Sequence, residues 1–178
     1  MTTIKGNILD IVELGNPILR QKALYVNNFD NVQELIDNMI TTVKDQKGLG
    51  IAAPQVNSPY QIFILNSYKA DNLLDMPERL LPIINPRMVS HSDEIIQGGE
   101  SCLSIPNKIG KVPRYSSVTL EYMSRNGNSI LQETFDGFIA RIIQHEYDHL
   151  QGLVYLDRVE DKSTIMTIDE FLAKQKST

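Results

Sequence analysis

The pentapeptide His145-Glu146-Tyr147-Asp148-His149 fits the pattern H-E-x-x-H and lies inside the helix around which we expect the fold to be built. We predict that this helix begins near Asp136, a good N-cap residue, and runs to about Gln151 before Gly152 ends it. Histidines four positions apart lie one turn apart, so both imidazoles can ligate one metal ion. The glutamate stands beside such an ion, where it can accept a proton from water.

One face of the predicted helix carries titratable groups where a core helix would carry leucine. Phe138, Ile142, His145 and His149 each lie three or four residues beyond the last, so they share that face. Two of the three histidines in the chain fall on it. The alternative, a surface helix with two histidines by chance, fits this placement poorly. We therefore predict a metal site.

Two histidines leave a catalytic metal site one ligand short, because such sites usually combine three protein ligands with an open position. The sequence after the pentapeptide, Leu-Gln-Gly-Leu-Val-Tyr, contains no third histidine. The remaining candidates are Cys102, His91, Asp157 and Glu160. A lone cysteine is more often a buried core residue, but a thiolate ligand would explain one in the polar, turn-rich stretch 98–106.

Composition and charge exclude several classes of protein. The chain has 178 residues, and 17 Lys plus Arg against 22 Asp plus Glu leave a net charge of −5. The length predicts a single domain over residues 1–178, and the acidic balance argues against direct nucleic-acid binding. One cysteine cannot form an internal disulfide, no secretory signal is visible, and no apolar run reaches the roughly 18 residues of a membrane span. We expect a cytoplasmic protein with no membrane association.

Hydrophobic periodicity predicts a second long helix, from Asn31 to Gly48, with Asn31 and Glu34 as a capping box. Its apolar stripe is Val32, Leu35, Ile36, Met39, Ile40 and Val43.

Strand patterns fill most of the chain between the two helices. We predict strands over 61–65, 80–84 and 88–96, the last two separated at Pro86, and a hairpin of 118–123 with 130–135 around Asn126-Gly127. A loop is expected over 69–77 and a short amphipathic stretch over 165–172. The fold class is therefore α+β, with mainly antiparallel β-sheets around a central metal-binding helix.

The stretch Gly48-Leu-Gly-Ile-Ala-Ala-Pro-Gln55 begins where the predicted helix over 31–48 ends. Its small residues allow close approach of the backbone, and Gln55 presents an amide beside them. It lacks the G-x-x-x-x-G-K-[ST] pattern of a phosphate loop.

Three motifs together resemble the peptide deformylase family. Residues 48–55 are similar to its G-x-G-[hydrophobic]-A-A-x-Q motif, Glu100-Ser-Cys-Leu-Ser104 to its E-G-C-L-S motif, and residues 145–149 to its H-E-x-D-H motif. They come in the family's order and at about its spacing, and the resemblance spans roughly residues 8–159.

The resemblance implies a fold, a reaction and a set of roles. It implies an α+β hydrolase that removes the formyl group from the N-terminal formyl-methionine of newly made polypeptides and releases formate. The implied metal ligands are Cys102, His145 and His149. Glu146 is the implied general acid and base, Gln55 and the backbone N–H of Leu103 the oxyanion donors, and Gly48, Leu49 and Gly50 the substrate-binding residues. The cofactor implied is one divalent metal, Fe²⁺, with Ni²⁺, Co²⁺ or Zn²⁺ as substitutes.

Some positions depart from the family pattern. Ser101 replaces the usual Gly, and we expect it to have a negative φ that accommodates serine. Ile109 is apolar where some relatives have Arg, which would alter how a substrate side chain is held. From Asp161 onward, three acidic and three basic residues make a neutral tail, so ribosome contact through a basic C-terminal helix is not expected. Asp148 is not a ligand by spacing, but could orient Arg114 or a backbone group, or simply be solvated.

Two rival functions remain open from the sequence. An H-E-x-x-H endopeptidase shares the metal and the glutamate but would cleave internal amide bonds. A relative without activity would bind metal or formyl peptides, although such a protein has no need of the base Glu146.

Overall fold

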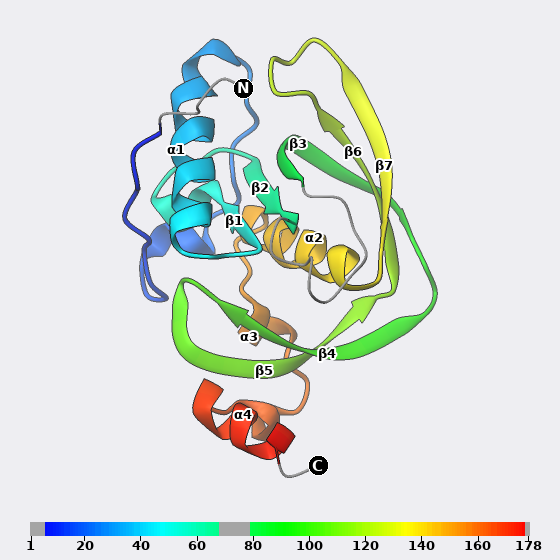
Figure 1. Ribbon diagram of the computed structural model, residues 1–178. Helices are drawn as coiled ribbons and strands as arrows, with labels where there is room; N and C mark the ends of the chain where they lie inside the picture. Colours follow the sequence, from blue (N-terminus) through cyan, green and yellow to red (C-terminus); the bar gives the residue numbers. More distant parts are fainter. Residues whose placement is uncertain (1–5, 68–78, 177–178) are drawn as a thin grey trace.

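The computed structural model describes residues 6–67 and 79–176, and it confirms an α+β fold with mainly antiparallel sheet (Figure 1). The strands are β1 (Gly50–Ala52), β2 (Ile62–Asn66), β3 (Leu80–His91), β4 (Ile95–Cys102), β5 (Ile105–Tyr115), β6 (Ser117–Met123) and β7 (Ile130–Asp136). The helices are α1 (Gln33–Asp45), α2 (Gly137–Leu150), α3 (Tyr155–Arg158) and α4 (Ile168–Lys176), with short 3-10 turns between them. The loop predicted over 69–77 lies outside the described residues. In the described part of the chain, no helix combines the length and apolar character that crossing a bilayer requires.

The strands form two sheets with α2 between them. β1, β2, β3, β6 and β7 make a five-stranded sheet in the order β1-β2-β3-β6-β7, and β4 pairs with β5 in a separate hairpin. Every pairing between these strands is antiparallel. Helix α2 packs against β1, β2, β6 and β7 on one side and β5 on the other (Figure 1). The prediction of a central helix surrounded by strands is therefore confirmed.

The alternation of side chains in β2 and β3 explains how two helices share one sheet. Phe63, Leu65 and Ile83 belong to one core cluster with the apolar residues of α2. Ile62, Ile64 and Ile84 belong to a second cluster with the apolar stripe of α1. Because successive strand residues point to opposite faces, a strand covered on both faces must be apolar throughout. The continuous apolar run in β2 has this cause, and it holds α1 and α2 on opposite faces of the sheet.

The predicted break at Pro86 is wrong, since β3 runs continuously from Leu80 to His91. Its pairing with β6 shifts register between Ile84 and Arg87, and Asn85 has a φ of 50°. A bulge of this kind tolerates a proline, which has no N–H to donate to the ladder. The Asn85 side chain also bonds both backbone groups of Val26, which fixes the bulge in place.

The hairpin of β4 and β5 was not predicted over most of its length. Sequence patterns placed a strand only as far as residue 96 and a turn-rich stretch over 98–106. The structure has long strands joined by a two-residue turn at Leu103 and Ser104. Glycines, prolines and polar residues give this region a low strand propensity, which tertiary packing overrides.

Helix ends differ in detail from the prediction. A 3-10 turn (Asp30–Val32) precedes α1, whose N-cap is Val32. The prediction of a capping box formed by Asn31 and Glu34 is therefore wrong. At the other end, Lys47 rather than Gly48 takes the left-handed conformation, with a φ of 55°. For α2 the predicted limits hold to within a residue, although the Asp136 side chain makes no capping bond.

Candidate metal centre and active site

Cys102, His145 and His149 converge on one buried point. Cys102 ends β4, and the two histidines lie one turn apart on α2. Their potential ligand atoms all lie within 4.8 Å of one another, and Nε2 of His149 is 3.3 Å from Sγ of Cys102. Cys102, His145 and His149 form the one group of three metal-ligating side chains found within residues 6–67 and 79–176.

The other candidates for the third ligand do not belong to this cluster, and Glu160 is exposed. His91 is exposed and stacks on Tyr115 at a ring distance of 3.7 Å. Asp157 pairs with Arg20 and accepts a bond from the backbone N–H of Val154. The tertiary structure thus selects Cys102 from the alternatives that sequence spacing left open.

The donor set and the electrostatics of this cluster fit a bound divalent metal. One sulfur and two imidazole nitrogens are ligands suited to borderline transition metals. Burial, helped by His145, lowers the pKa of His149 well below its ordinary value, which keeps it in the neutral form that ligates. Burial also acts to lower the pKa of His145, yet Cys102 and Glu100 outweigh it and raise that pKa. Cys102 and Glu100 therefore place negative charge beside the imidazole of His145.

A buried ion-pair network orients His145. Glu100 accepts a hydrogen bond from Nδ1 of His145 at 2.9 Å and two more from Arg114, which also donates to Asp148 at 2.6 Å. Burial raises the pKa of Glu100, but the bonds from His145 and Arg114 prevail and lower it to about 2. The ionised carboxylate holds the proton on Nδ1 and leaves Nε2 for the centre. Of the alternatives that the sequence left open for Asp148, the structure shows the contact with Arg114, and Asp148 is buried rather than solvated.

Glu146 is placed to exchange a proton at the cluster. It is buried, and its Oε2 has no hydrogen-bond partner among the described residues. Burial raises its pKa to about 7, with a further contribution from Glu100, against the opposing effect of His145 and Arg114. A carboxyl group with such a pKa can both accept and return a proton near neutrality.

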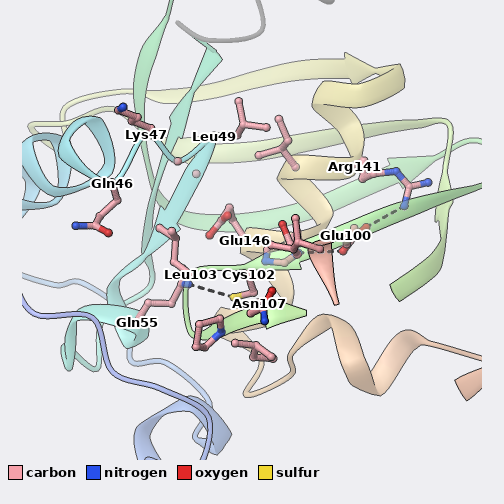
Figure 2. Close-up of a pocket in the computed structure, with 18 of the residues that line it drawn as sticks. Gln46, Lys47, Leu49, Gln55, Glu100, Cys102, Leu103, Asn107, Arg141 and Glu146 are labelled. Atoms are coloured by element: carbon pink, nitrogen blue, oxygen red, sulfur yellow. Dashed lines mark hydrogen bonds and ion pairs between the residues drawn. The ribbon is translucent and has the colours of Figure 1, made fainter. Parts of the chain in front are cut away.

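The amide of Gln55 is fixed in one orientation. The backbone N–H of Ala52 donates to Oε1 of Gln55 at 2.8 Å, which turns the amide nitrogen the other way. That nitrogen lies 3.4 Å from Sγ of Cys102 (Figure 2) and 3.3 Å from Oγ of Ser104. The short 3-10 turn of residues 53–56 carries Gln55 to this position, so an N–H donor faces the cluster.

A cavity of about 510 Å³ opens beside these groups (Figure 2). Gly48, Leu49 and Gly50 line one wall, and Leu103 another. A Cβ atom on Gly50 would lie 2.5 Å from Oε1 of Glu146, so only glycine lets the backbone of β1 pass so close to this carboxylate. Among the described strands, β1 lies at the edge of the sheet and pairs with β2 alone.

The positions that depart from the family pattern fit the structure. Ser101 does not have a positive φ, as predicted, so a side chain causes no backbone strain there. Ile109 pairs with Met166 through two backbone bonds of 3.0 Å and lies against Gly99, on the side of the C-terminal segment.

Two residues of the site received no role from the sequence. Glu100 was noted only as part of a motif, and Arg141, whose Nη1 donates to Glu100 at 2.9 Å, was not noted. The available signal for Arg141 was its position four residues before His145, on the same face of α2.

Comparisons with known proteins agree with this geometry. The family model for polypeptide deformylase matches residues 8–164. Peptide deformylase 2 of Nostoc sp. is 44% identical over 167 residues, which cover 92% of this chain and 93% of that protein.

Solved structures give the same result. The class I type b peptide deformylase of Acinetobacter baumannii, bound to Met-Ala-Ser, is 34% identical with a TM-score of 0.80, and the match covers 87% of this chain and all of that one. A peptide deformylase from Synechococcus elongatus in complex with actinonin is 35% identical with a TM-score of 0.78, covering 93% and 85%. The chain therefore belongs to the polypeptide deformylase family of metallo-hydrolases.

Proposed function

We propose that this chain removes the formyl group from N-terminal formyl-methionine of newly made polypeptides, with Cys102, His145 and His149 as ligands of one metal ion. The observation that carries this proposal is the convergence of these three side chains next to Glu146, whose pKa burial raises to about 7. The reaction products are formate and a peptide with a free N-terminus.

Fe²⁺ is the metal we propose, with Ni²⁺, Co²⁺ or Zn²⁺ able to take its place. Imidazole and thiolate are ligands that all of these ions accept. When bound, such an ion would polarise the formyl carbonyl and lower the pKa of a water molecule.

Proton transfer is the role of Glu146. Its buried carboxylate takes a proton from the attacking water and later returns it to the departing amine. The raised pKa suits both steps, because the carboxyl group is neither too weak a base nor too weak an acid near neutral pH.

Negative charge on the former carbonyl oxygen requires donors that are already in position. Nε2 of Gln55 and the backbone N–H of Leu103 supply them. The bond from Ala52 holds the Gln55 amide in the required orientation before substrate arrives. One preorganised donor of this kind contributes about 3 kcal/mol to transition-state stabilisation.

Substrate binding uses the free edge of β1. The backbone of Gly48, Leu49 and Gly50 lines the cavity, and an extended peptide can add to a sheet edge through main-chain hydrogen bonds. Phe138 and Ile142 of α2 also line the cavity and provide apolar surface for a methionine side chain. The Met-Ala-Ser complex of the Acinetobacter baumannii relative supports a peptide substrate.

The domain organisation and cellular location are also part of the proposal. We propose a single catalytic domain over residues 1–178 that acts in the cytoplasm, without membrane association or direct nucleic-acid binding. The lone, buried Cys102 supports a reducing compartment. The neutral tail from Asp161 onward does not support ribosome docking by a basic helix.

The test compares formyl-Met-Ala-Ser with the same peptide unformylated and with a longer peptide blocked by an acetyl group. We expect formate from the first alone, from protein purified without oxygen and containing one metal ion. Cleavage of internal amide bonds would support the endopeptidase instead, and metal binding without formate release would support a non-catalytic relative.

A further inference from the structure

The side chain of Arg141 extends from α2 across the inner face of the β4–β5 hairpin. Its relative exposure is 8%. Nη1 donates to Glu100 at 2.9 Å (Figure 2). Nη1 also donates to the carbonyl of Val112 at 2.8 Å, and Nη2 donates to the carbonyl of Ile96 at 2.6 Å. The guanidinium therefore joins both strands of the hairpin to the carboxylate that holds His145.

The carboxylate of Glu100 is held from two directions. Oε1 accepts from Arg141 and from Nε of Arg114, and Oε2 accepts from Nη2 of Arg114 and Nδ1 of His145. Arg114 grips both oxygens, and Arg141 adds a donor anchored in the backbone of the hairpin. A carboxylate bound in this way cannot rotate without breaking charge-assisted bonds, which are the stronger class of hydrogen bond.

We propose that Arg141 is a positioning residue, which holds Glu100 in the orientation that fixes the ring of the metal ligand His145. The inference rests on the proposed function in one respect, that Cys102, His145 and His149 hold the metal. Loss of the Arg141 contact would let Glu100 and the His145 ring reorient, so the metal would bind more weakly and in altered geometry. Outer partners of this kind typically change metal affinity by about 10–100-fold.

Gly98 provides an independent way to move Arg141. A Cβ atom on Gly98 would lie 2.8–2.9 Å from Cζ, Nε and Nη2 of Arg141, so the guanidinium must shift to admit it. The neighbouring Gly99 faces the opposite side of the hairpin, where a Cβ would lie 3.1 Å from Ile109. Neither glycine has a positive φ, so alanine brings no backbone strain at either position. The two glycines make a matched pair of sites.

The experiment compares the full chain with Arg141→Met, Arg141→Lys, Gly98→Ala and Gly99→Ala. Co²⁺ affinity is measured by competition with a chelator, and the visible absorption of the Co²⁺ protein reports ligand geometry. We expect Arg141→Met and Gly98→Ala to weaken Co²⁺ binding by about 10–100-fold and to change the spectrum. Arg141→Lys restores part of the affinity, and Gly99→Ala matches the unaltered chain.

A purely structural role predicts a different result. Arg141→Met and Gly98→Ala would then lower the unfolding temperature while the folded proteins keep the original Co²⁺ affinity and spectrum, which overturns the proposal. If Arg141→Met does not fold, Gly98→Ala still tests the proposal, because this variant keeps the positive charge of Arg141 and only displaces its guanidinium. If the unaltered chain binds no metal or releases no formate, the proposed function fails. If the unaltered chain is active and binds metal, but Gly98→Ala has the same Co²⁺ affinity and spectrum as that chain, only the role of Arg141 is refuted.

Discussion

Helices α1 and α2 pack on opposite faces of the same strands, yet their buried sides differ in chemistry. The buried side of α1 is almost entirely apolar, and Thr42 is its one buried polar residue. Helix α2 presents Ile139, Ala140 and Ile143 to the sheet. It also carries a second set of buried residues, all polar: Arg141, Gln144, His145, Glu146, Asp148 and His149.

The difference follows from what covers each helix. α1 has a sheet on one side only, so a single apolar stripe is sufficient for its packing. α2 lies between the large sheet and the β4–β5 hairpin, and its second side is therefore removed from water as well. Buried charges are costly unless they are paired, and most of those on α2 are held by Glu100 and Arg114. Two polar atoms of α2, Oε2 of Glu146 and Nδ1 of His149, have no hydrogen-bond partner among the described residues, and both belong to residues of the candidate active site.

Glu146→Ala is the strongest test of the contrast between the apolar side of α1 and the polar side of α2. We expect formate release to fall by about 10²–10⁴-fold, since the general acid and base is removed, while metal content stays at one ion per chain. Activity is followed with formyl-Met-Ala-Ser, and metal by elemental analysis. Turnover that survives this change would show that the polar side of α2 does not carry the chemistry.

The next largest effect is expected from Cys102→Ser. A hydroxyl is a poorer ligand than a thiolate for these ions, so metal affinity should fall by more than about 100-fold, and activity with it. His91→Asn is the control, because His91 was an alternative ligand and lies exposed against Tyr115. Stoichiometric metal in Cys102→Ser would remove this residue from the centre.

Gln55→Ala should act on the chemical step alone. With one oxyanion donor lost, kcat should fall by about 100-fold, with little change in KM or in metal content. Ser104→Ala, which removes a neighbour of the same amide, is the milder control. An effect confined to KM would instead assign Gln55 to substrate binding.

The smallest effect on activity is expected from substitutions of the buried apolar residues of α1 and α2. Ile36 of α1 and Ile143 of α2 are both fully buried, so alanine at either position should lower the free energy of unfolding by about 2–5 kcal/mol. Below the unfolding transition, both variants should keep the parent kcat, as judged by denaturant titration beside the formate assay. A large loss of kcat in Ile143→Ala with none in Ile36→Ala would mean that the two sides of α2 do not act separately.

Local sequence patterns were sufficient to predict an element wherever the periodicity of a single helix or hairpin defines it. The limits of α2, the stripe of α1 and the hairpin of β6 with β7 around Asn126-Gly127 were predicted correctly. β4 and β5 were missed because their glycines and prolines carry little strand signal. The bulge at Pro86 depends on a distant partner, since Asn85 is fixed by Val26.

The sequence alone determined that two imidazoles share one face of a helix with a carboxylate beside them, because spacing along a helix is a local property. It determined the family as well, through three motifs in order. The family resemblance implied Cys102 as the third ligand, but only the tertiary structure brings its sulfur next to the two imidazoles and places the Glu100 carboxylate, bound by Arg141, against His145. These contacts join residues dozens of positions apart, and their geometry depends on how α2 packs against the β4–β5 hairpin, which no periodicity along the chain encodes.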